Sequence, residues 1–283
     1  MHEISAYVPV RNNAITLPAV LRSIREQSIP VADLIVIDDG SDDSSSIVAK
    51  EFGARVFRFE QNRGRGAARA KAIEEARYEV ILSVDGTNVL PPDFVARGLK
   101  WLGDARTAAV FGRMVQYVET TAVARWRGRH LFKQGQQFTA AGGANLATYG
   151  CILKRSKAIE VGNFDAELRQ GEDADLGRRI LSAGYDVIFD PEMHIVSIST
   201  NTLSGVLERY WRWTNHGHAR VSAVAYLRQI WYALRVMMPQ DLSAKDPAAA
   251  LISLLWPHYG LMLDLRHVMQ SSQSNRTSPH KPV

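Results

Sequence analysis

Apolar residues in the first half of the chain gather in short runs, and three of these, at residues 4–10, 34–37 and 80–84, are almost uninterrupted. Strands that are apolar on both faces belong to parallel sheets covered on both sides. Between the runs, apolar residues repeat at helical spacing after Thr16, which we expect to cap a helix, and residues 64–76 form an alanine-rich helix. With a further strand at 55–59, this order predicts a Rossmann-like α/β fold: a mostly parallel sheet with helices on both faces.

The regular alternation of strand and helix patterns ends at about residue 105. Helices are expected at 121–133 and at 172–183, where Gly184 ends the second one. Strands are expected at residues 108–118, 147–153, 186–189 and 194–198.

Beyond Thr202 the pattern is almost wholly helical, and Pro239 and Pro247 are expected to divide it into two long helices. The polar, proline-containing end of the chain is expected to be disordered. The chain is therefore expected to hold a domain at 1–220, a C-terminal helical extension at 221–270 and a tail at 271–283.

Composition narrows the class of protein. A content of 46% hydrophobic and 22% charged residues over 283 positions is ordinary for a folded, soluble protein. The single cysteine, Cys151, excludes an intramolecular disulfide framework and fits a reducing compartment. The N-terminus has no basic region ahead of an apolar core, and the best apolar run, 248–256, is shorter than a bilayer requires. We expect a cytoplasmic protein.

The net charge of +5 indicates anionic partners without naming them. Arginines gather at 58–71, 125–133 and 209–228. Nucleic acid, phosphorylated substrates and anionic lipid would all suit these clusters, and solvated helix faces explain them equally well.

Three acidic clusters stand where apolar runs stop or where a helix begins. Asp38 and Asp39 follow the second strand, Asp85 follows the strand at 80–84, and Glu172 and Asp173 open a helix. Carboxylates at the C-terminal ends of parallel strands face the crevice in which open α/β sheets bind ligands. The middle cluster, Asp85-Gly86-Thr87-Asn88, holds one carboxylate where phosphate-bound metal chemistry usually has two.

The order of motifs over residues 4–215 resembles the GT-A glycosyltransferases, specifically the large inverting family 2. The motifs are Val8-Pro9-Val10-Arg11-Asn12, Asp38-Asp39-Gly40-Ser41, Asn62-Arg63-Gly64 with Arg69, Asp85 with Pro92-Asp93-Phe94, Gly162-Asn163-Phe164-Asp165, Glu172-Asp173-Ala174-Asp175-Leu176 and Arg209-Tyr210-Trp211-Arg212-Trp213. Each is weak alone, and their order and spacing carry the resemblance.

The resemblance implies a nucleotide site in the first half of the chain. Asp38 and Asp39 would hold the base or ribose, since ionised carboxylates accept hydrogen bonds. Gly64 would let backbone approach the ligand, and Arg69 would add positive charge on the nucleotide side. Pro9 and Asn12 would turn the chain so that backbone groups meet the nucleoside. Asp42 and Asp43 are better explained as caps of the next helix.

Asp85 resembles the first acid of the family's Asp-x-Asp metal motif. Mg²⁺ or Mn²⁺ there would bridge the diphosphate of the donor and neutralise the leaving nucleotide. Thr87 stands at the place of the second acid, so either Asn88 and water complete the shell or metal dependence is weakened. Ser197 stands where family members often carry a histidine, and strand alternation is expected to turn His194 to another face. His216-Gly217-His218 lacks zinc spacing.

The resemblance makes Asp173 the catalytic base, which takes the acceptor hydroxyl proton as that oxygen attacks the anomeric carbon. Glu172 would position the acceptor or orient its neighbour, and Asp175 would point elsewhere. The alternative is that these acids only stabilise the N-terminus of a helix. No nucleophile is required, so Cys151 is expected to be a packed thiol.

Arg209, Arg212 and Trp213 resemble the family signature that pairs with the diphosphate and stacks on the acceptor sugar. The same side chains would also suit a helix on a membrane surface. Beyond residue 220, apolar side chains are arranged amphipathically at Ile230, Trp231, Leu234, Met237 and Met238, and again at Leu251, Leu254, Leu255 and Trp256. A membrane surface and a homodimer interface explain this stripe equally well.

The resemblance therefore implies an inverting transfer of sugar from a UDP, GDP or dTDP donor to a hydroxyl acceptor, glycan or lipid-linked, in cell-surface polysaccharide or glycolipid synthesis. Nucleic acid is not an expected partner. The expected place is the cytoplasm, including the inner face of the plasma membrane. One alternative is a non-catalytic nucleotide-sugar-binding protein with a degenerate metal motif, against which Asp173 argues. Nucleotidyl transfer is weaker, because its glycine-rich loop is missing.

Overall fold

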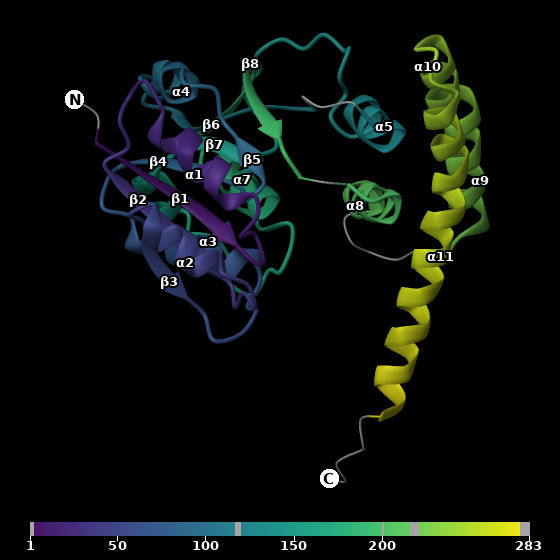
Figure 1. The fold of residues 1–283 in the computed structure, drawn as a ribbon, viewed down its shortest axis with the longest axis horizontal. Coiled ribbons are helices and arrows are strands. Elements are labelled where there is room, and N and C mark those ends of the chain that lie inside the picture. Colours follow the sequence, from purple (N-terminus) through teal and green to yellow (C-terminus); the bar gives the residue numbers. More distant parts are fainter. Residues whose placement is uncertain (1–2, 117–119, 200, 216–220, 278–283) are drawn as a thin grey trace. The chain divides into compact units, whose positions relative to one another are not determined.

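The structure, a computed structural model, describes residues 3–116, 120–199, 201–215 and 221–277 (Figure 1). The chain divides into two compact units. The first comprises residues 1–117 and 136–199, and the second comprises residues 118–135 and 200–283. The segment 118–135, which lies within the domain expected at 1–220, therefore groups with the C-terminal helices.

The described residues of the first unit build one sheet of eight strands in the order β3-β2-β1-β4-β7-β6-β8-β5. The first four neighbours, β3, β2, β1 and β4, are parallel, and β7 runs antiparallel to both β4 and β6. The predicted mostly parallel sheet is confirmed. The strands are β1 Ile4–Val10, β2 Asp33–Asp38, β3 Arg55–Arg58, β4 Val80–Val84, β5 Asn88–Val89, β6 Thr107–Gln116, β7 Gly150–Lys154 and β8 Asp186–Ser197.

Helices cover both faces of this sheet, as predicted. Alternate strand residues point to opposite faces, so Val36 and Leu82 pack in one core cluster and Ile35 and Ile81 in the other. The first cluster takes buried residues from α1 Leu17–Arg25, α2 Ser45–Glu51 and α4 Phe94–Leu102. The second takes them from α3 Arg65–Glu75, α6 Arg155–Glu160 and α7 Glu172–Ser182.

Strand β8 corrects the prediction of two separate strands at 186–189 and 194–198. It is one strand, and its pairing with β6 jumps from Asp190 to His194 between Gly112 and Arg113. The intervening bulge presses against Gly112, where a Cβ would lie 1.9 Å from the carbonyl oxygen of Met193. Both predicted segments are thus halves of one bulged strand.

The second unit is helical among its described residues. Its elements are α5 Ala122–His130, α8 Leu203–Asn215, α9 Ala223–Tyr232, the π-helical turn η1 Ala233–Met237, α10 Met238–Ser243 and α11 Pro247–Thr277. Pro247 begins α11 as expected, but Pro239 lies in the first turn of α10 and does not interrupt the run, because a first-turn proline lacks only an N–H that has no partner there. Helix α11 continues to Thr277, and residues 278–283 lie outside the described residues, so the expected disorder of the tail at 271–283 stays a prediction.

Helix α11 also departs from the expectation that no segment reaches spanning length. The part Pro247–Met269 is long and apolar enough to cross a membrane by length and composition, and its 18-residue apolar window has a mean hydropathy of 1.3. Half of that window is buried inside the structure. A core helix of a soluble protein meets the same criteria.

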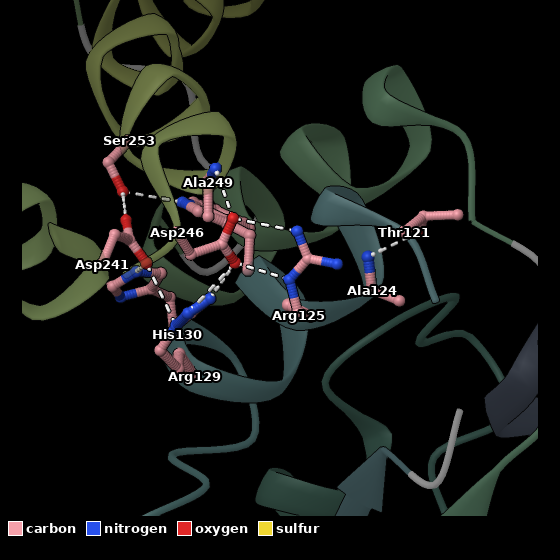
Figure 2. A network of polar contacts seen from close by, with 10 residues as sticks. Thr121, Ala124, Arg125, Arg129, His130, Asp241, Asp246, Ala249 and Ser253 are labelled. Atoms are coloured by element: carbon pink, nitrogen blue, oxygen red, sulfur yellow. Dashed lines mark hydrogen bonds and ion pairs between the residues drawn. The ribbon is translucent and has the colours of Figure 1, made fainter. Parts of the chain in front are cut away.

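The basic helix α5 is held by two buried acids of the C-terminal helices (Figure 2). Arg125 donates through Nε and Nη2 to the two carboxylate oxygens of Asp246 at 2.6 and 2.9 Å, and Arg129 pairs with the same carboxylate. His130 and Ser253 contact Asp241 at 2.9 and 2.6 Å. The arginine cluster at 125–133 is therefore neither a simple solvated face nor, at Arg125 and Arg129, a free anion-binding surface.

Candidate active site

The predicted site residues of the first unit lie at the carboxyl edge of the parallel strands. Strand β1 lies between β2 and β4, so the chain leaves β1 toward one side and returns on the other. Ligands of open α/β sheets bind outside the strand ends at such a switch point. Asp39 and Asp85 follow β2 and β4 directly, Asn12 lies two residues after β1, and all three share this edge.

Asn12 fixes the first loop to the second. Its φ of +56° lies in the left-handed region, which asparagine tolerates better than most residues. Its backbone N–H donates to Ser41 Oγ at 3.0 Å, and its Oδ1 accepts from the Asp42 N–H at 2.8 Å. Pro9, at the end of β1, pairs in register with Ile37. Asn12 therefore holds the loop that follows Asp38.

The two acids after β2 are both buried, and each holds a different loop. Asp38 is fully buried, where it accepts from the Ser41 N–H at 2.8 Å and from the Ser46 hydroxyl. Asp39 is 7% exposed, and it accepts from the backbone N–H groups of Arg63 and Gly64 at 2.6 and 2.9 Å. Asp38 thus shapes its own loop and Asp39 holds the loop at 62–64, and the nucleoside contact expected of both acids stays a prediction.

Gly64 has a local reason to be glycine. Its φ is +95°, and a Cβ there would lie 3.0 Å from the Cα of Arg169. Arg169 in turn donates to the Asn62 side chain at 2.8 Å. The loop at 62–64 is therefore joined to Asp39 on one side and to the segment leading into α7 on the other.

Arg69 lies at the centre of the site. Its side chain is 2% exposed and reaches two carboxylates, Glu172 through Nε at 3.0 Å and Asp85 through Nη2 at 2.8 Å. Nη1 donates to Ser83 Oγ at 3.1 Å and, more weakly, to Tyr7 Oη and the Thr148 carbonyl, both at 3.5 Å. The sequence predicts a nucleotide contact for Arg69, whereas the structure engages its guanidinium with protein groups.

Electrostatics keep Arg69 charged in this interior. Burial lowers its pKa, but Asp85, Tyr7, Glu172 and Asp173 together raise the pKa well above its ordinary value. The same burial raises the pKa of Tyr7, against the opposing effect of Arg69. The site therefore contains a permanent buried cation balanced by acids on two different elements.

Glu172 and Asp173 divide into a buried and an exposed acid. Gly171 caps α7 with a left-handed φ of +77°, and Glu172 is the first helical residue. Glu172 is 1% exposed, and its Oε2 has no protein donor among the described residues. Asp173 is partly exposed, and its Oδ1 accepts from the Ala174 N–H at 2.9 Å. Of the two, Asp173 is the one that a substrate can reach.

Asp175 follows the expectation that it points elsewhere. It pairs with Arg178 and Arg179 on its own helix. These hydrogen bonds outweigh burial and lower its pKa. The carboxylate of Asp175 is therefore engaged by arginines of its own helix.

Asp85 keeps one oxygen for a ligand. Oδ1 accepts from Arg69, and the side chain is 32% exposed. The turn after Asp85 is held by Thr16, whose hydroxyl donates to the Gly86 carbonyl at 2.6 Å. Thr16 stands at the N-cap position of α1 as predicted, but its side chain makes no capping hydrogen bond there. A single carboxylate with an accessible oxygen suits a divalent cation that takes its other ligands from phosphate and water.

Asn88 fits the metal hypothesis less well. It is 2% exposed in β5, and its amide nitrogen donates to the Tyr149 carbonyl at 2.9 Å. Among the described residues, no three His, Cys, Asp or Glu side chains gather as a ligand set. Any metal at this edge would depend on Asp85.

Ser83 and Thr148 contact Arg69, and Tyr149 follows Thr148 in the chain; the sequence did not predict a role for these three residues. Burial raises the pKa of Tyr149, and Asp173, Cys151 and Asp85 raise it further, so both site acids lie within electrostatic range of this phenol. Ser83 could have been noticed, because it is the one polar residue in the strand Val80–Val84.

Three other predictions concern residues near this edge. His194 is exposed between buried Met193 and Ile195, so it faces away from Ser197 as strand alternation predicts. Cys151 is a free, fully buried thiol, and burial raises its pKa. His216 and His218 lie outside the described residues.

Arg209, Arg212 and Trp213 lie on α8 of the second unit. Tyr210 and Trp211, between them, face the interior, where Tyr210 packs on Trp256 at 4.6 Å between ring centroids. Trp213 is 47% exposed. Since these residues belong to the other unit, their part in donor or acceptor binding stays a prediction.

The sheet, its two helical layers and the acids at its edge define a glycosyltransferase of the GT-A class. Residues 5–162 match the family model described as glycosyl transferase family 2, and the chain belongs to this family.

Two curated relatives carry sequence similarity. The chain is 28% identical to the pre-mycofactocin glycosyltransferase of Mycobacterium tuberculosis (strain H37Rv) over 67% of its own length and 41% of the relative's. It is 24% identical to the poly-beta-1,6-N-acetyl-D-glucosamine synthase of Staphylococcus epidermidis over 82% of its length and 57% of the relative's. The chain thus spans about half the length of these relatives.

Among solved structures, the mannosyltransferase PcManGT from Pyrobaculum calidifontis, in complex with GDP-Man and Mn²⁺, is similar with a TM-score of 0.58 and 16% identity. That likeness covers 93% of this chain and 87% of the mannosyltransferase. The 1–349 fragment of S. aureus TarS gives a TM-score of 0.55 at 14% identity, over 99% and 94% of the two chains. At these identities the likeness concerns the fold.

Proposed function

We propose that the chain is an inverting glycosyltransferase that moves a sugar from a nucleotide-diphosphate donor to a hydroxyl acceptor. The observation that carries this proposal is the pair of salt bridges from Arg69 to Asp85 and to Glu172, which connects the end of β4 to the start of α7. It fixes an accessible carboxylate at the strand edge and places Asp173, the next residue after Glu172, on the exposed side of the same helix turn.

In this reaction Asp173 removes the proton from the acceptor hydroxyl while that oxygen attacks the anomeric carbon. The new glycosidic bond forms opposite the bond to the diphosphate, which breaks and leaves its electron pair on the phosphate oxygen. Asp39 and the loop at Asn12 would receive the nucleoside. Glu172 is a positioning residue, since its carboxylate is buried against Arg69.

A divalent cation fits this site through Asp85 alone. Mg²⁺ or Mn²⁺ held there would neutralise the charge that grows on the leaving diphosphate. The solved mannosyltransferase of similar fold was obtained with GDP-Man and Mn²⁺, which supports a nucleotide-sugar donor and a divalent cation here. Arg209 and Arg212 are further candidates for the diphosphate.

The relatives support a proposal for the class of acceptor. The staphylococcal relative is named as a polysaccharide synthase, so we propose a glycan or lipid-linked acceptor in cell-surface polysaccharide or glycolipid synthesis. A peripheral place at the inner face of the plasma membrane agrees with that class of acceptor.

The test is a panel of UDP, GDP and dTDP sugars, each with and without Mn²⁺. We expect one donor to raise the melting temperature and to release free nucleotide with an added acceptor, and NMR of the product to show the anomeric configuration opposite to that of the donor. A raised melting temperature with no transfer for any acceptor class would favour a nucleotide-sugar-binding protein. A product with the donor's configuration would contradict inversion.

A further inference from the structure

The second unit presents a row of apolar side chains to solvent along α9 and η1. Val224, Leu227, Trp231 and Leu234 are 67, 62, 60 and 43% exposed. Their spacing of three and four residues places them on one side of the helical run. Single exposed apolar residues are ordinary, but a continuous row of them indicates a contact surface.

Neighbouring helices continue this apolar character. Tyr226 of α9 and His258 of α11 meet at 2.8 Å between Oη and Nδ1, and Figure 1 shows the two helices side by side. Leu251 and Leu255, one turn apart on α11, are 62 and 50% exposed. The exposed apolar side chains therefore belong to one group of packed helices.

On the same helices the negative side chains are buried and the positive ones are exposed. Between residues 221 and 269 the three acids Asp241, Asp246 and Asp264 are all buried. The exposed charged side chains of this segment are all cations: Arg228, Arg235, Lys245 and Arg266. Among the described residues of this segment, the charge that faces solvent is therefore positive.

We propose that the α9–η1 face is a docking surface for a membrane that contains anionic phospholipid. Arg228 and Arg235 follow Val224 and Trp231 by four residues each, so they flank the apolar row. Long basic side chains can lay their stems along apolar surface and reach the headgroups, while the aromatic and aliphatic side chains enter the interface. Each cation adds attraction to an anionic leaflet.

Two other occupants fit these observations less well. In a symmetric dimer the same patch meets itself, so the cations of one copy would face those of the other, with no exposed acid on this segment to pair them. Insertion of α11 across the bilayer would remove its buried face from the unit, where Ser253 accepts from Trp126 at 2.8 Å and Asp264 accepts from Trp211 at 3.0 Å.

The proposal is tested by co-sedimentation of the full chain with vesicles of phosphatidylcholine, alone or mixed with phosphatidylglycerol. We expect binding to the mixed vesicles only, weakened at high salt. Leu227→Ser with Trp231→Ser should lower the partition coefficient at least about tenfold. Arg228→Gln with Arg235→Gln should lower it roughly 25-fold, about fivefold for each cation.

The matched control lies on α2 of the first unit, where Ile47 is 61% exposed and Lys50 is also exposed. Ile47→Ser with Lys50→Gln should leave vesicle binding unchanged. Because the readout is lipid binding, it can fail while sugar transfer persists, and the reverse also holds.

Three results would overturn the proposal: equal binding to neutral vesicles, equal loss in the control pair, or α9 variants that keep their vesicle binding. Analytical ultracentrifugation adds a direct comparison with the dimer. If the α9 variants convert a dimer to a monomer and leave vesicle binding intact, a second copy is the occupant. Unchanged melting temperatures of the variants establish that loss of binding is not loss of folding.

Discussion

Arg69 donates from Nε to Glu172 Oε1 at 3.0 Å, although the two side chains are only 2 and 1% exposed. The same guanidinium donates to Asp85, so one buried cation joins the N-terminal turn of α7 to the end of β4. A buried ion pair loses its balance when one partner is removed, because the remaining charge is left without compensation.

Replacing Arg69 by methionine is therefore expected to lower the free energy of unfolding by about 3–5 kcal/mol. Transfer activity should fall at least about 100-fold, since Asp173 and Asp85 would no longer be fixed relative to each other. Urea denaturation and a nucleotide-release assay measure the two effects.

Arg65→Met is the control for that variant, because Arg65 is exposed on the same helix. The double variant Arg69→Met with Glu172→Gln should regain part of the lost stability, since the stranded carboxylate is gone, and should not regain activity. Wild-type stability in the single variant would show that the buried pair contributes nothing net.

Asp173→Asn is expected to lower turnover about 10²–10⁴-fold, the range typical of a lost general base. Donor affinity should change little, because the proposed role of Asp173 concerns the acceptor. Calorimetric titration with the donor and single-turnover kinetics separate the two quantities.

Asp175→Asn is the matched control, since Asp175 is paired with Arg178 and Arg179 on α7. It should keep turnover within a few-fold of the wild type. If Asp173→Asn loses donor binding and Asp175→Asn loses turnover, the assignment of the base is wrong.

Asp85→Ala should weaken donor binding when Mg²⁺ or Mn²⁺ is present and have a smaller effect in chelator, since Asp85 is the one candidate ligand with an accessible oxygen. Asn88→Ala should behave differently. Its amide is buried against the Tyr149 carbonyl, so we expect a loss of about 1–3 kcal/mol in stability and an unchanged response to metal. A metal response that disappears in Asn88→Ala would restore Asn88 as a ligand.

The sheet could be predicted from the sequence because its strands are apolar on both faces and its helices are periodic. The partners of Arg69 could not. Glu172 lies 103 residues further along the chain, and no local pattern tells whether an arginine near a strand edge will face a ligand or the interior. Asp38 and Asp39 show the same limit, because these adjacent acids are both buried but accept hydrogen bonds from different loops.

The basic cluster at 125–133 shows why composition alone leaves alternatives open. Arg125 and Asp246 are separated by 121 residues, and the acids that neutralise this helix are scattered among apolar residues near the C-terminus. Charge counted along the sequence cannot reveal such pairing, which depends on how the helices pack.

Asp246 yields a prediction about pH. Hydrogen bonds from Arg125 hold its pKa well below the ordinary range, burial opposes this, and Arg129 adds to it. Because the folded pKa lies below the unfolded value of about 3.9, the stabilisation is present above that pH and is lost as the pH falls toward the folded pKa. Asp246→Asn should therefore lower the free energy of unfolding by about 3 kcal/mol near neutral pH.

The difference between this variant and the wild type should shrink at about pH 3, because Asp246 is then partly protonated in the unfolded wild type but still ionised in the folded one, and this lowers the wild type's free energy of unfolding. Tryptophan fluorescence during urea unfolding measures the free energy of unfolding and reports mainly on the second unit. That unit contains five of the six tryptophans, Trp126, Trp211, Trp213, Trp231 and Trp256, and Trp101 belongs to the first. Glu208→Gln is the control, because Glu208 forms an exposed pair with Arg212 at 3.8 Å and such pairs contribute little. An equal difference at both pH values would mean that Asp246 stabilises the helices by packing and not by its charge.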